Sequence, residues 1–337
     1  MATRMGEESW WRRVGRAEEG FRYLRVNGEP VVSELALRRI RRLAIPPAWT
    51  DVHVAPDPGR RLQAWGRDAA GRKQYIYSAE HVAARDRRKW RRVLRIARVL
   101  PLLRSATNEH LAGEALCREK VLATVVRLMA RAYFRAGSER YAVQNRTFGI
   151  CTLCKAHVRI DGNSLVFTYT GKRRVDQRRV VADTPLVGII REVLELPGER
   201  LFQYIDEEGR VRGVTPAAVN RYLERILGAR YTSKDLRTFG GTVRAATILA
   251  DIGPAAGARE AKQNVVLCSR LVAAELGNTP AIARRAYIHP AVLERYEVAG
   301  LTIEPLMRRD PRPVAVREPA GHYPEEEALI RFLQQYG

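Results

Sequence analysis

The stretch SKDLRTFGGTVRAATILADIG, residues 233–253, decides the fold class of the larger, C-terminal part of the chain. Ser233 is a residue type that caps helix N-termini, and Gly253 followed by Pro254 is a typical helix end. The stretch therefore predicts one long helix. Three nearby segments also predict helices, because each begins with Thr-Pro, a cap followed by a residue whose fixed φ suits the first helical turn: residues 184–196, 215–228 and 279–290.

A small sheet is predicted within this helical region, between residues 148 and 182. FGICTLCKAHVRI, NSLVFTYT and RRVVAD have the alternation of half-buried strands, and the turn-forming DGN and GKRR separate them. We expect the rest of the region to be helical. Residues 305–320, rich in Pro and Arg, predict a linker to a terminal amphipathic helix, PEEEALIRFLQQY.

The N-terminal part has a different character. Short strand-like runs, FRYLRV, DVHVAP, LQAWGRD and KQYIYS, surround one helix that Ser33 caps and Pro46-Pro47 ends. The turn GRDAAGRK predicts a hairpin loop. After Ser78 the pattern becomes helical, with many Arg residues beside an apolar stripe. We predict an α+β protein: a small β-rich domain over residues 1–85 and a mainly helical domain over 86–337 with a small antiparallel sheet.

The charge balance favours a polyanionic partner. The chain has 59 Lys and Arg against 37 Asp and Glu, a formal net charge of +22, so nucleic acid is the first expectation. An acidic membrane surface is the rival, but no apolar run reaches the length of a spanning helix. The N-terminus MATRMGEESWWRRVG lacks the apolar core of an export signal, so we expect a cytoplasmic protein.

The four cysteines raise the question of a metal or redox site. Cys151 and Cys154 form C-x-x-C, with His157 three residues further on. No second ligand pair accompanies them, since Cys117 and Cys268 stand alone. We therefore expect buried or half-buried thiols, no metal and no cofactor.

Four fragments carry the residue types that metal-independent phosphodiester transesterification needs: YFRAGSERY, TGKRRV, SKDLRTFGG and LGNTPAIARRAY. Such a reaction requires a nucleophile, cations for the non-bridging oxygens and an acid for the leaving oxygen. Arginine suits the second role, because its planar guanidinium binds phosphate bidentately and keeps its charge. A tyrosine hydroxyl, with an ordinary pKa of ~10, needs nearby cations to act as a nucleophile.

In order and spacing, these fragments resemble the active-site segments of poxvirus-like bacterial type IB DNA topoisomerases, which share their catalytic fold with tyrosine recombinases. GRKQYIYSAEHVAARDRRKW is also similar to that family's DNA-clamping segment, so the resemblance runs from Phe21 to Glu297. It implies that Arg135 and Arg237 hold the scissile phosphate, that Lys172 is the general acid, and that Tyr287 is the nucleophile. Lys234 and Tyr141, within the matching fragments, are taken as DNA contacts.

One position departs from the family pattern. Where many relatives carry histidine before Thr-Pro, this chain has Asn278. Asparagine can donate a hydrogen bond to a phosphate oxygen, but it carries no charge and shuttles no proton. We therefore expect Asn278 to make a smaller contribution to the same site.

Each residue also has an ordinary structural interpretation. Arg135 follows an apolar helix and would, alone, be a helix-end charge; Lys172 in a basic turn would be a plain phosphate contact; Tyr287 would be a core aromatic. Only their joint occurrence favours a catalytic site.

In the N-terminal domain, the resemblance positions Gln74, Tyr75 and Tyr77 to touch bases, with Arg72 and Lys73 on the DNA backbone. At least one of the two tyrosines is expected simply to pack on a sheet face. The basic helix segment DRRKWRR is expected to follow phosphates.

The resemblance implies a monomeric enzyme that closes around duplex DNA and relaxes supercoils of either sign through a 3′-phosphotyrosyl intermediate without ATP or metal. Two alternatives remain at this point. A tyrosine recombinase would use the same chemistry, although Lys234-Asp-Leu-Arg237 replaces the usual His-x-x-Arg. A non-catalytic basic protein on the same scaffold would bind DNA with steep salt dependence and form no covalent adduct.

Overall fold

The computed structural model describes residues 9–307 and 319–337 of the 337-residue chain. The chain divides into two compact units, one ending at Lys89 and the other beginning at Trp90. The smaller unit is rich in strands and the larger one is mainly helical, so the predicted α+β class is confirmed. Most of the predicted linker, residues 308–318, lies outside the described residues.

The smaller unit is built on a five-stranded antiparallel sheet with the order β2-β1-β3-β4-β5. Its core is small because a single helix packs on one face, where Ile40 meets Val52, Val54 and Ala64. The elements are β1 (Trp11–Val14), β2 (Arg22–Leu24), α1 (Glu34–Arg42), β3 (Thr50–Val54), β4 (Leu62–Arg67) and β5 (Lys73–Tyr77). The sequence patterns predicted all of these except β1, and Ser33 caps α1 as expected.

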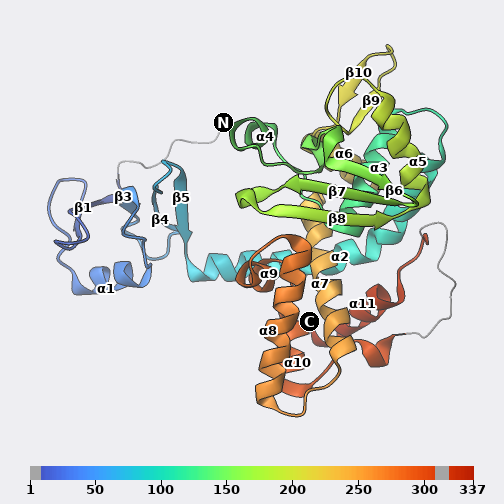
Figure 1. Cartoon of the computed structure of the whole chain (residues 1–337). Coiled ribbons are helices and arrows are strands. Elements are labelled where there is room, and N and C mark those ends of the chain that lie inside the picture. The colour runs from blue at the N-terminus through green and yellow to red at the C-terminus, as the bar shows by residue number, and fades with distance from the viewer. Residues whose placement is uncertain (1–8, 308–318) are drawn as a thin grey trace. The chain divides into compact units, whose positions relative to one another are not determined.

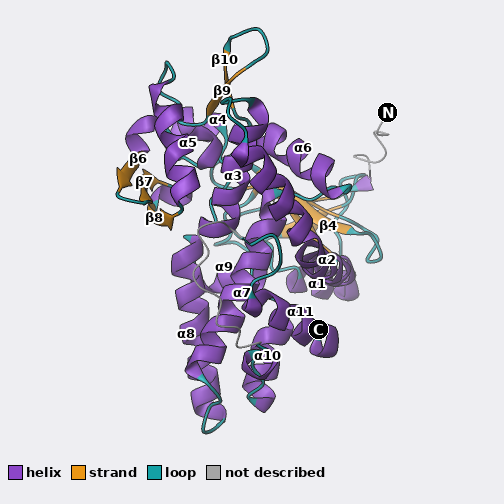
Figure 2. Ribbon diagram, turned by 90° about the vertical axis from the view of Figure 1, so that its right-hand side faces the viewer, coloured by secondary structure: helices purple, strands orange, loops and turns teal. Residues whose placement is uncertain are grey.

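The larger unit begins within α2 (Ala79–Ala112), which is longer than its sequence pattern indicated. Figure 1 shows α7 (Ser233–Ile252), α8 (Ala258–Leu276) and α10 (Pro290–Ala299) running side by side, and Figure 2 shows the same bundle from the side. The remaining helices are α3 (Arg118–Ala132), α4 (Glu139–Asn145), α5 (Thr184–Glu195), α6 (Pro216–Leu227), α9 (Pro280–Ala286) and α11 (Pro324–Tyr336).

The predicted small sheet is present as a three-stranded antiparallel sheet with the order β6-β7-β8. Its strands are β6 (Val158–Asp161), β7 (Ser164–Thr170) and β8 (Asp176–Ala182). One part of the prediction was wrong. ICTLCKAH forms two short 3₁₀ helices, Ile150–Thr152 and Lys155–His157, and the strand begins only at Val158.

Two further expectations for this unit were wrong. The region outside residues 148–182 is not all helical, because β9 (Gln203–Ile205) and β10 (Val211–Gly213) form a short hairpin. Helix α5 is capped by Asp183 rather than Thr184, with the Asp183 carboxylate accepting a bond from the Leu186 N–H. An aspartate in this place satisfies a free N–H and also binds cations on another helix.

The α7 helix is the centre of the larger unit, and its small residues explain how closely other elements approach it. A Cβ at Gly240 would collide with the ring of Tyr133, and one at Gly241 would lie 3.0 Å from the Tyr287 carbonyl oxygen. The Gly-Gly pair in KDLRTFGG therefore lets two tyrosines pack closely on α7. Tyr133 lies two residues before Arg135, and Tyr287 belongs to the predicted site. No helix among the described residues is long and apolar enough to cross a membrane.

A buried ion cluster joins α3 to the start of α5. The Asp183 side chain is 1% exposed and lies 2.8 Å from Arg127 Nε and 2.6 Å from Arg131 Nη1. We expect Asp183→Ala to lower the free energy of unfolding by about 3 kcal/mol, because it removes a helix cap and the acid that faces a buried arginine. Urea unfolding followed by circular dichroism at 222 nm measures this.

Asp161→Ala is the matched control. It removes a carboxylate from the Arg159–Asp161 pair, whose side chains are 69% and 60% exposed. Its expected cost is under about 1 kcal/mol. Equal losses for the two variants would contradict the role given to Asp183.

Candidate active site

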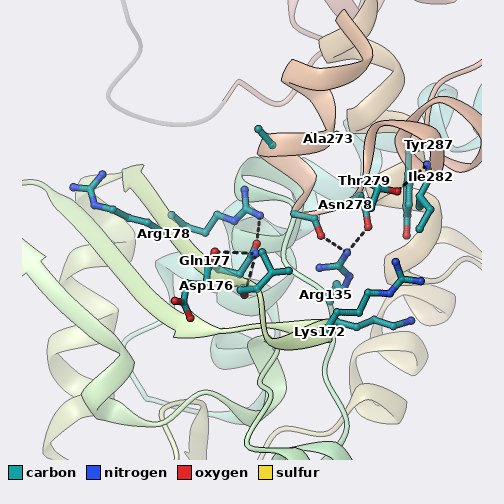
Figure 3. Close-up of a pocket in the computed structure, with 15 residues that line it drawn as sticks. Arg135, Lys172, Asp176, Gln177, Arg178, Ala273, Asn278, Thr279, Ile282 and Tyr287 are labelled. Atoms are coloured by element: carbon teal, nitrogen blue, oxygen red, sulfur yellow. Dashed lines mark hydrogen bonds between the residues drawn. The ribbon is translucent and has the colours of Figure 1, made fainter. Parts of the chain in front are cut away.

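An open pocket of about 310 Å³ lies in the larger unit, lined by the β7–β8 turn, the end of α8 and the α9 segment. Four of the five residues predicted to be catalytic line it: Arg135, Lys172, Asn278 and Tyr287 (Figure 3). The fifth, Arg237, is buried beside it, with its guanidinium carbon 5.3 Å from the centre of the Tyr287 ring. The fold therefore brings together five side chains that span more than 150 positions in the sequence.

Arg135 is held by the segment that follows α3. Helix α3 ends at Tyr133, whose left-handed backbone (φ +56°) turns the chain, and Phe134 is buried against Phe167. The Arg135 carbonyl oxygen then accepts a bond from the Ile150 N–H at 2.8 Å. The chain can approach so closely because residue 149 is glycine, where a Cβ would lie 2.6 Å from the Arg135 carbonyl oxygen.

The end of α8 provides acceptors for both predicted phosphate-binding arginines. Arg237 Nη2 donates to the Leu276 carbonyl oxygen at 2.9 Å, and Arg135 Nη2 donates to the Gly277 carbonyl oxygen at 2.8 Å. These carbonyls belong to the last turn of a helix, where carbonyls have no partner within the helix and the dipole is negative. Main-chain oxygens hold the two arginines in position without neutralising their charge.

Burial lowers the pKa of the guanidinium groups of both Arg135 and Arg237. It lowers the pKa of Arg237 to about 10, with the positive charge of Arg135 adding to the effect and Tyr287 opposing it. Burial likewise lowers the pKa of Arg135, and Tyr287 again opposes the shift. A pKa of about 10 leaves Arg237 protonated at neutral pH, so the site presents two desolvated cations.

Asn278 is oriented by Arg135. Its Oδ1 accepts a bond from Arg135 Nη2 at 2.5 Å, and Figure 3 shows the two side chains directed toward one another. Its Nδ2 is buried and has no hydrogen-bond partner among the described residues. A buried donor without an acceptor is uncommon in folded proteins. The amide therefore has an N–H that no acceptor in the described residues uses; its bond to a phosphate oxygen remains a prediction.

Tyr287 lies immediately after α9 and is half-buried. Helix α7 supports its main chain: the Thr242 hydroxyl lies 3.1 Å from the Tyr287 carbonyl oxygen and accepts a bond from the His289 N–H at 3.2 Å. Because Gly241 adds no Cβ at this contact, the tyrosine sits close to α7 and thus to Arg237.

Lys172 begins the turn between β7 and β8 and is exposed. Arg173 and Arg174, the next two residues, have left-handed backbone with φ of +66° and +58°. Such a tight turn is rarely formed by non-glycine residues. Figure 3 shows the Lys172 side chain extending across the pocket from this turn.

Two predicted DNA contacts in the larger unit are not part of the pocket. Lys234 is exposed on the first turn of α7, on the same helix as Arg237 but not among the pocket-lining residues. Tyr141 is 53% exposed on α4. Both remain predictions.

The predicted contacts of the smaller unit lie on or beside β5. Tyr75 is 48% exposed, and Tyr77 lies on the same face with its ring centre 6.3 Å away. Lys73 Nζ lies 3.7 Å from the centre of the Trp65 ring, which itself stacks on His53. The sheet thus presents a lysine held by aromatic rings.

Gln74 and Arg72 have partners within the same hairpin. Gln74 Nε2 donates to Asp68 Oδ2 at 2.9 Å, and Arg72 Nη2 lies 2.8 Å from the same oxygen. The hydrogen bond from Arg72 is the main cause that lowers the Asp68 pKa to about 2. Since neighbouring residues on a strand face opposite sides, Gln74 does not share the face of Tyr75 and Tyr77. The base and backbone contacts expected of these residues remain predictions.

Sequence reasoning did not single out several residues that line the pocket, among them Arg179 and Gln177 on β8. The strand RRVVAD was predicted and Gln177 lies just before it, but nothing in that run distinguishes an arginine that faces the site from one that faces solvent. Thr242 was missed for a similar reason, because its role depends on a contact between α7 and a residue 45 positions later.

The C-x-x-C segment supports the backbone beside Arg135, and its two cysteines form no disulfide. Cys151 is buried and its N–H donates to the Ala136 carbonyl oxygen at 2.9 Å, while the Cys154 N–H donates to His157 Nδ1 at 2.9 Å. Burial raises the pKa of Cys151 to about 12. Cys117, expected to be at least half-buried, is exposed at the start of α3. Over residues 9–307 and 319–337, no cluster of His, Cys, Asp and Glu is arranged to hold a metal ion.

Comparisons with known proteins identify the family of the chain. Residues 73–305 match the family model described as the catalytic core of eukaryotic DNA topoisomerase I, and residues 20–68 match the N-terminal domain of bacterial DNA topoisomerase IB. DNA topoisomerase 1B of Acanthamoeba polyphaga mimivirus is 30% identical over 278 residues, covering 80% of this chain and 82% of that protein.

Two more similarities are weaker. DNA topoisomerase 1B of vaccinia virus (strain Copenhagen) is 26% identical over 264 residues, covering 76% of this chain and 80% of that protein. A solved structure of the XerH site-specific recombinase bound to palindromic difH substrate aligns at a TM-score of 0.39 and 12% identity, over 69% of this chain and 58% of that one. That structural likeness is too low to support an argument.

Proposed function

Because the chain belongs to the type IB DNA topoisomerase family, we propose that it relaxes positive and negative supercoils by joining Tyr287 to one DNA strand, letting the strand swivel, and resealing it. One observation carries this proposal. Arg237 and Arg135 are bound to adjoining carbonyls at the end of α8; Arg237 lies 5.3 Å from the centre of the Tyr287 ring, and Arg135 lines the same open pocket as Tyr287. A phosphodiester in that pocket would meet a nucleophile and two charged donors.

The reaction is an exchange of one ester for another. The Tyr287 hydroxyl gives up its proton to water as its oxygen bonds to phosphorus, the bond from phosphorus to the 5′ oxygen breaks, and Lys172 gives that oxygen a proton. Arg135, Arg237 and Asn278 donate hydrogen bonds to the non-bridging oxygens as negative charge builds up on them. The reverse steps reseal the strand.

Neither ATP nor a metal ion is needed in this scheme. The phosphotyrosine conserves the energy of the broken ester, so resealing requires no other source. The guanidinium groups supply the positive charge that stabilises the transition state, and their desolvation strengthens that effect.

Duplex DNA is the proposed substrate and partner. A net charge of +22 favours a long polyanion. Lys73, Tyr75 and Tyr77 on β5 are proposed DNA contacts of the smaller unit, with Arg72 and Gln74 beside them; Lys234 and Tyr141 are proposed contacts of the larger one. We propose a monomer that acts on DNA in the cytoplasm, since every predicted catalytic residue comes from one chain.

Removal of the Tyr287 hydroxyl is expected to abolish activity. Supercoiled plasmid of either sign should be relaxed by the wild-type protein in excess chelator without nucleotide, and not by Tyr287→Phe, because the variant has no oxygen to attack phosphorus. Agarose gels measure relaxation, and denaturing gels detect the covalent adduct.

Tyr204→Phe, which removes a hydroxyl from β9, is the control and should relax plasmid at the wild-type rate. Relaxation by Tyr287→Phe would refute the assignment of the nucleophile. A requirement for divalent metal would refute the proposed role of the arginines.

The general-acid role of Lys172 has its own test. Lys172→Ala should slow strand cleavage by about 100-fold or more on ordinary DNA. A substrate with sulfur in place of the leaving 5′ oxygen should restore most of that rate, because a thiolate leaves without a proton. Single-turnover cleavage on denaturing gels measures both rates.

Arg135→Ala serves as the contrast, because loss of a phosphate-binding cation is not repaired by a better leaving group. Equal slowing of Lys172→Ala on both substrates would remove Lys172 from the acid role.

A further inference from the structure

A third arginine occupies the same pocket as the proposed catalytic residues. Arg179, on β8, lines the pocket and is half-buried. Its Nη1 donates to the Glu275 carbonyl oxygen, and its Nη2 donates to Gln177 Oε1 at 2.6 Å. Its positive charge also contributes to lowering the pKa of both Arg135 and Arg237. The guanidinium is therefore close enough to act on both.

The three arginines bind successive carbonyls of one helix end. Glu275 accepts from Arg179, Leu276 from Arg237, and Gly277 from Arg135. The last carbonyls of a helix project along its axis. A hydrogen bond that holds the Glu275 carbonyl therefore also constrains the carbonyls of the next two residues. Arg179 thus acts on the same short segment that orients both phosphate-binding arginines and carries Asn278.

The surroundings of this segment leave it little freedom. Gly277 has a left-handed backbone (φ +59°), and a Cβ there would collide with the Gln177 amide. On the other side, the Glu275 carboxylate binds Arg244 of α7 at 2.7 Å. The last turn of α8 is therefore held between α7 and β8, with Arg179 and Gln177 forming the β8 side.

None of the three arginines forms an ion pair with an acid within the described residues, and Nε of Arg179 and of Arg237 is buried without a hydrogen-bond partner there. Buried charged donors of this kind are suited to bind an anion.

We propose that Arg179 is a positioning residue for cleavage: it sets the end of α8 so that Arg237, Arg135 and Asn278 converge on one phosphate. This inference rests on the proposed function, since it concerns the same reaction. It assigns a role to a residue that none of the recognised fragments contains. Arg179 contributes two hydrogen bonds that run in different directions, and not only a positive charge.

The test compares Arg179→Met, Arg179→Lys and Arg270→Met. The first removes the charge and both bonds, and the second keeps the charge without the planar two-sided donor. The third removes an exposed arginine from α8 itself. Single-turnover cleavage at saturating DNA gives the rate of adduct formation, a mobility shift gives the dissociation constant, and circular dichroism verifies folding.

We expect Arg179→Met and Arg179→Lys to slow cleavage by about 100-fold, because small displacements of catalytic groups cost that much. DNA dissociation constants should change by less than about threefold, and Arg270→Met should match the wild type. A wild-type rate for Arg179→Met would overturn the proposal. A wild-type rate for Arg179→Lys would also overturn it, because charge alone would then suffice.

A double-mutant cycle separates positioning from general loss of stability. If Arg179 acts through the segment that carries Asn278, Arg179→Met combined with Asn278→Ala should cleave about as slowly as the slower single variant. Rates that multiply would overturn the proposal. Absence of any adduct from the wild-type protein would instead refute the proposed function, so the two failures are distinguishable.

Discussion

The end of helix α8 holds a cluster of positive charge with main-chain oxygen atoms in place of carboxylates. Three successive carbonyls accept bonds from Arg179, Arg237 and Arg135, and within the described residues none of these arginines has an acidic partner. Burying charge without a counter-ion is costly, and the helix dipole offsets only part of that cost. In the proposed function, a phosphate supplies the negative charge and the acceptor oxygens that these arginines would bind. The proposed catalytic chemistry depends on this constraint.

The packing around α7 explains why that charge lies next to a tyrosine. Gly241 and Thr242 let the Tyr287 main chain lie against the helix that carries Arg237. On another side of the site, the backbone after α3 pairs with the 3₁₀ turn at Ile150, and this contact fixes Arg135. The close contacts at Gly149 and Gly241 thus help to place Arg135 and Tyr287 at the same pocket. The C-x-x-C segment, which suggests a metal site when taken alone, serves as part of this scaffold.

Much of the fold follows from local patterns. Thr-Pro starts predicted α6 and α9, the Gly253-Pro254 end predicted where α7 stops although Thr232 and not Ser233 caps its start, and alternation predicted β7 and β8. The errors have local causes too: ICTLCKAH alternates like a strand, yet its backbone bonds are used by the Arg135 segment, and β9 and β10 are too short to leave a pattern. That Arg135, Lys172, Arg237, Asn278 and Tyr287 gather at one pocket was predictable because four fragments preserve a recognisable order, and their catalytic roles remain proposals. Arg179 was not, because no fragment contains it.

The sequence by itself determined the α+β class, the family and the chemical types available for catalysis, since these depend on short-range patterns and on residue identity. Only the tertiary structure decided which arginines share one helix end, that Asn278 turns its oxygen to Arg135 and leaves its N–H without a partner, and that Gln74 binds Asp68. Those facts depend on contacts between elements far apart in the chain, and a helix end acquires its partners only when the strand and the neighbouring helix are packed against it.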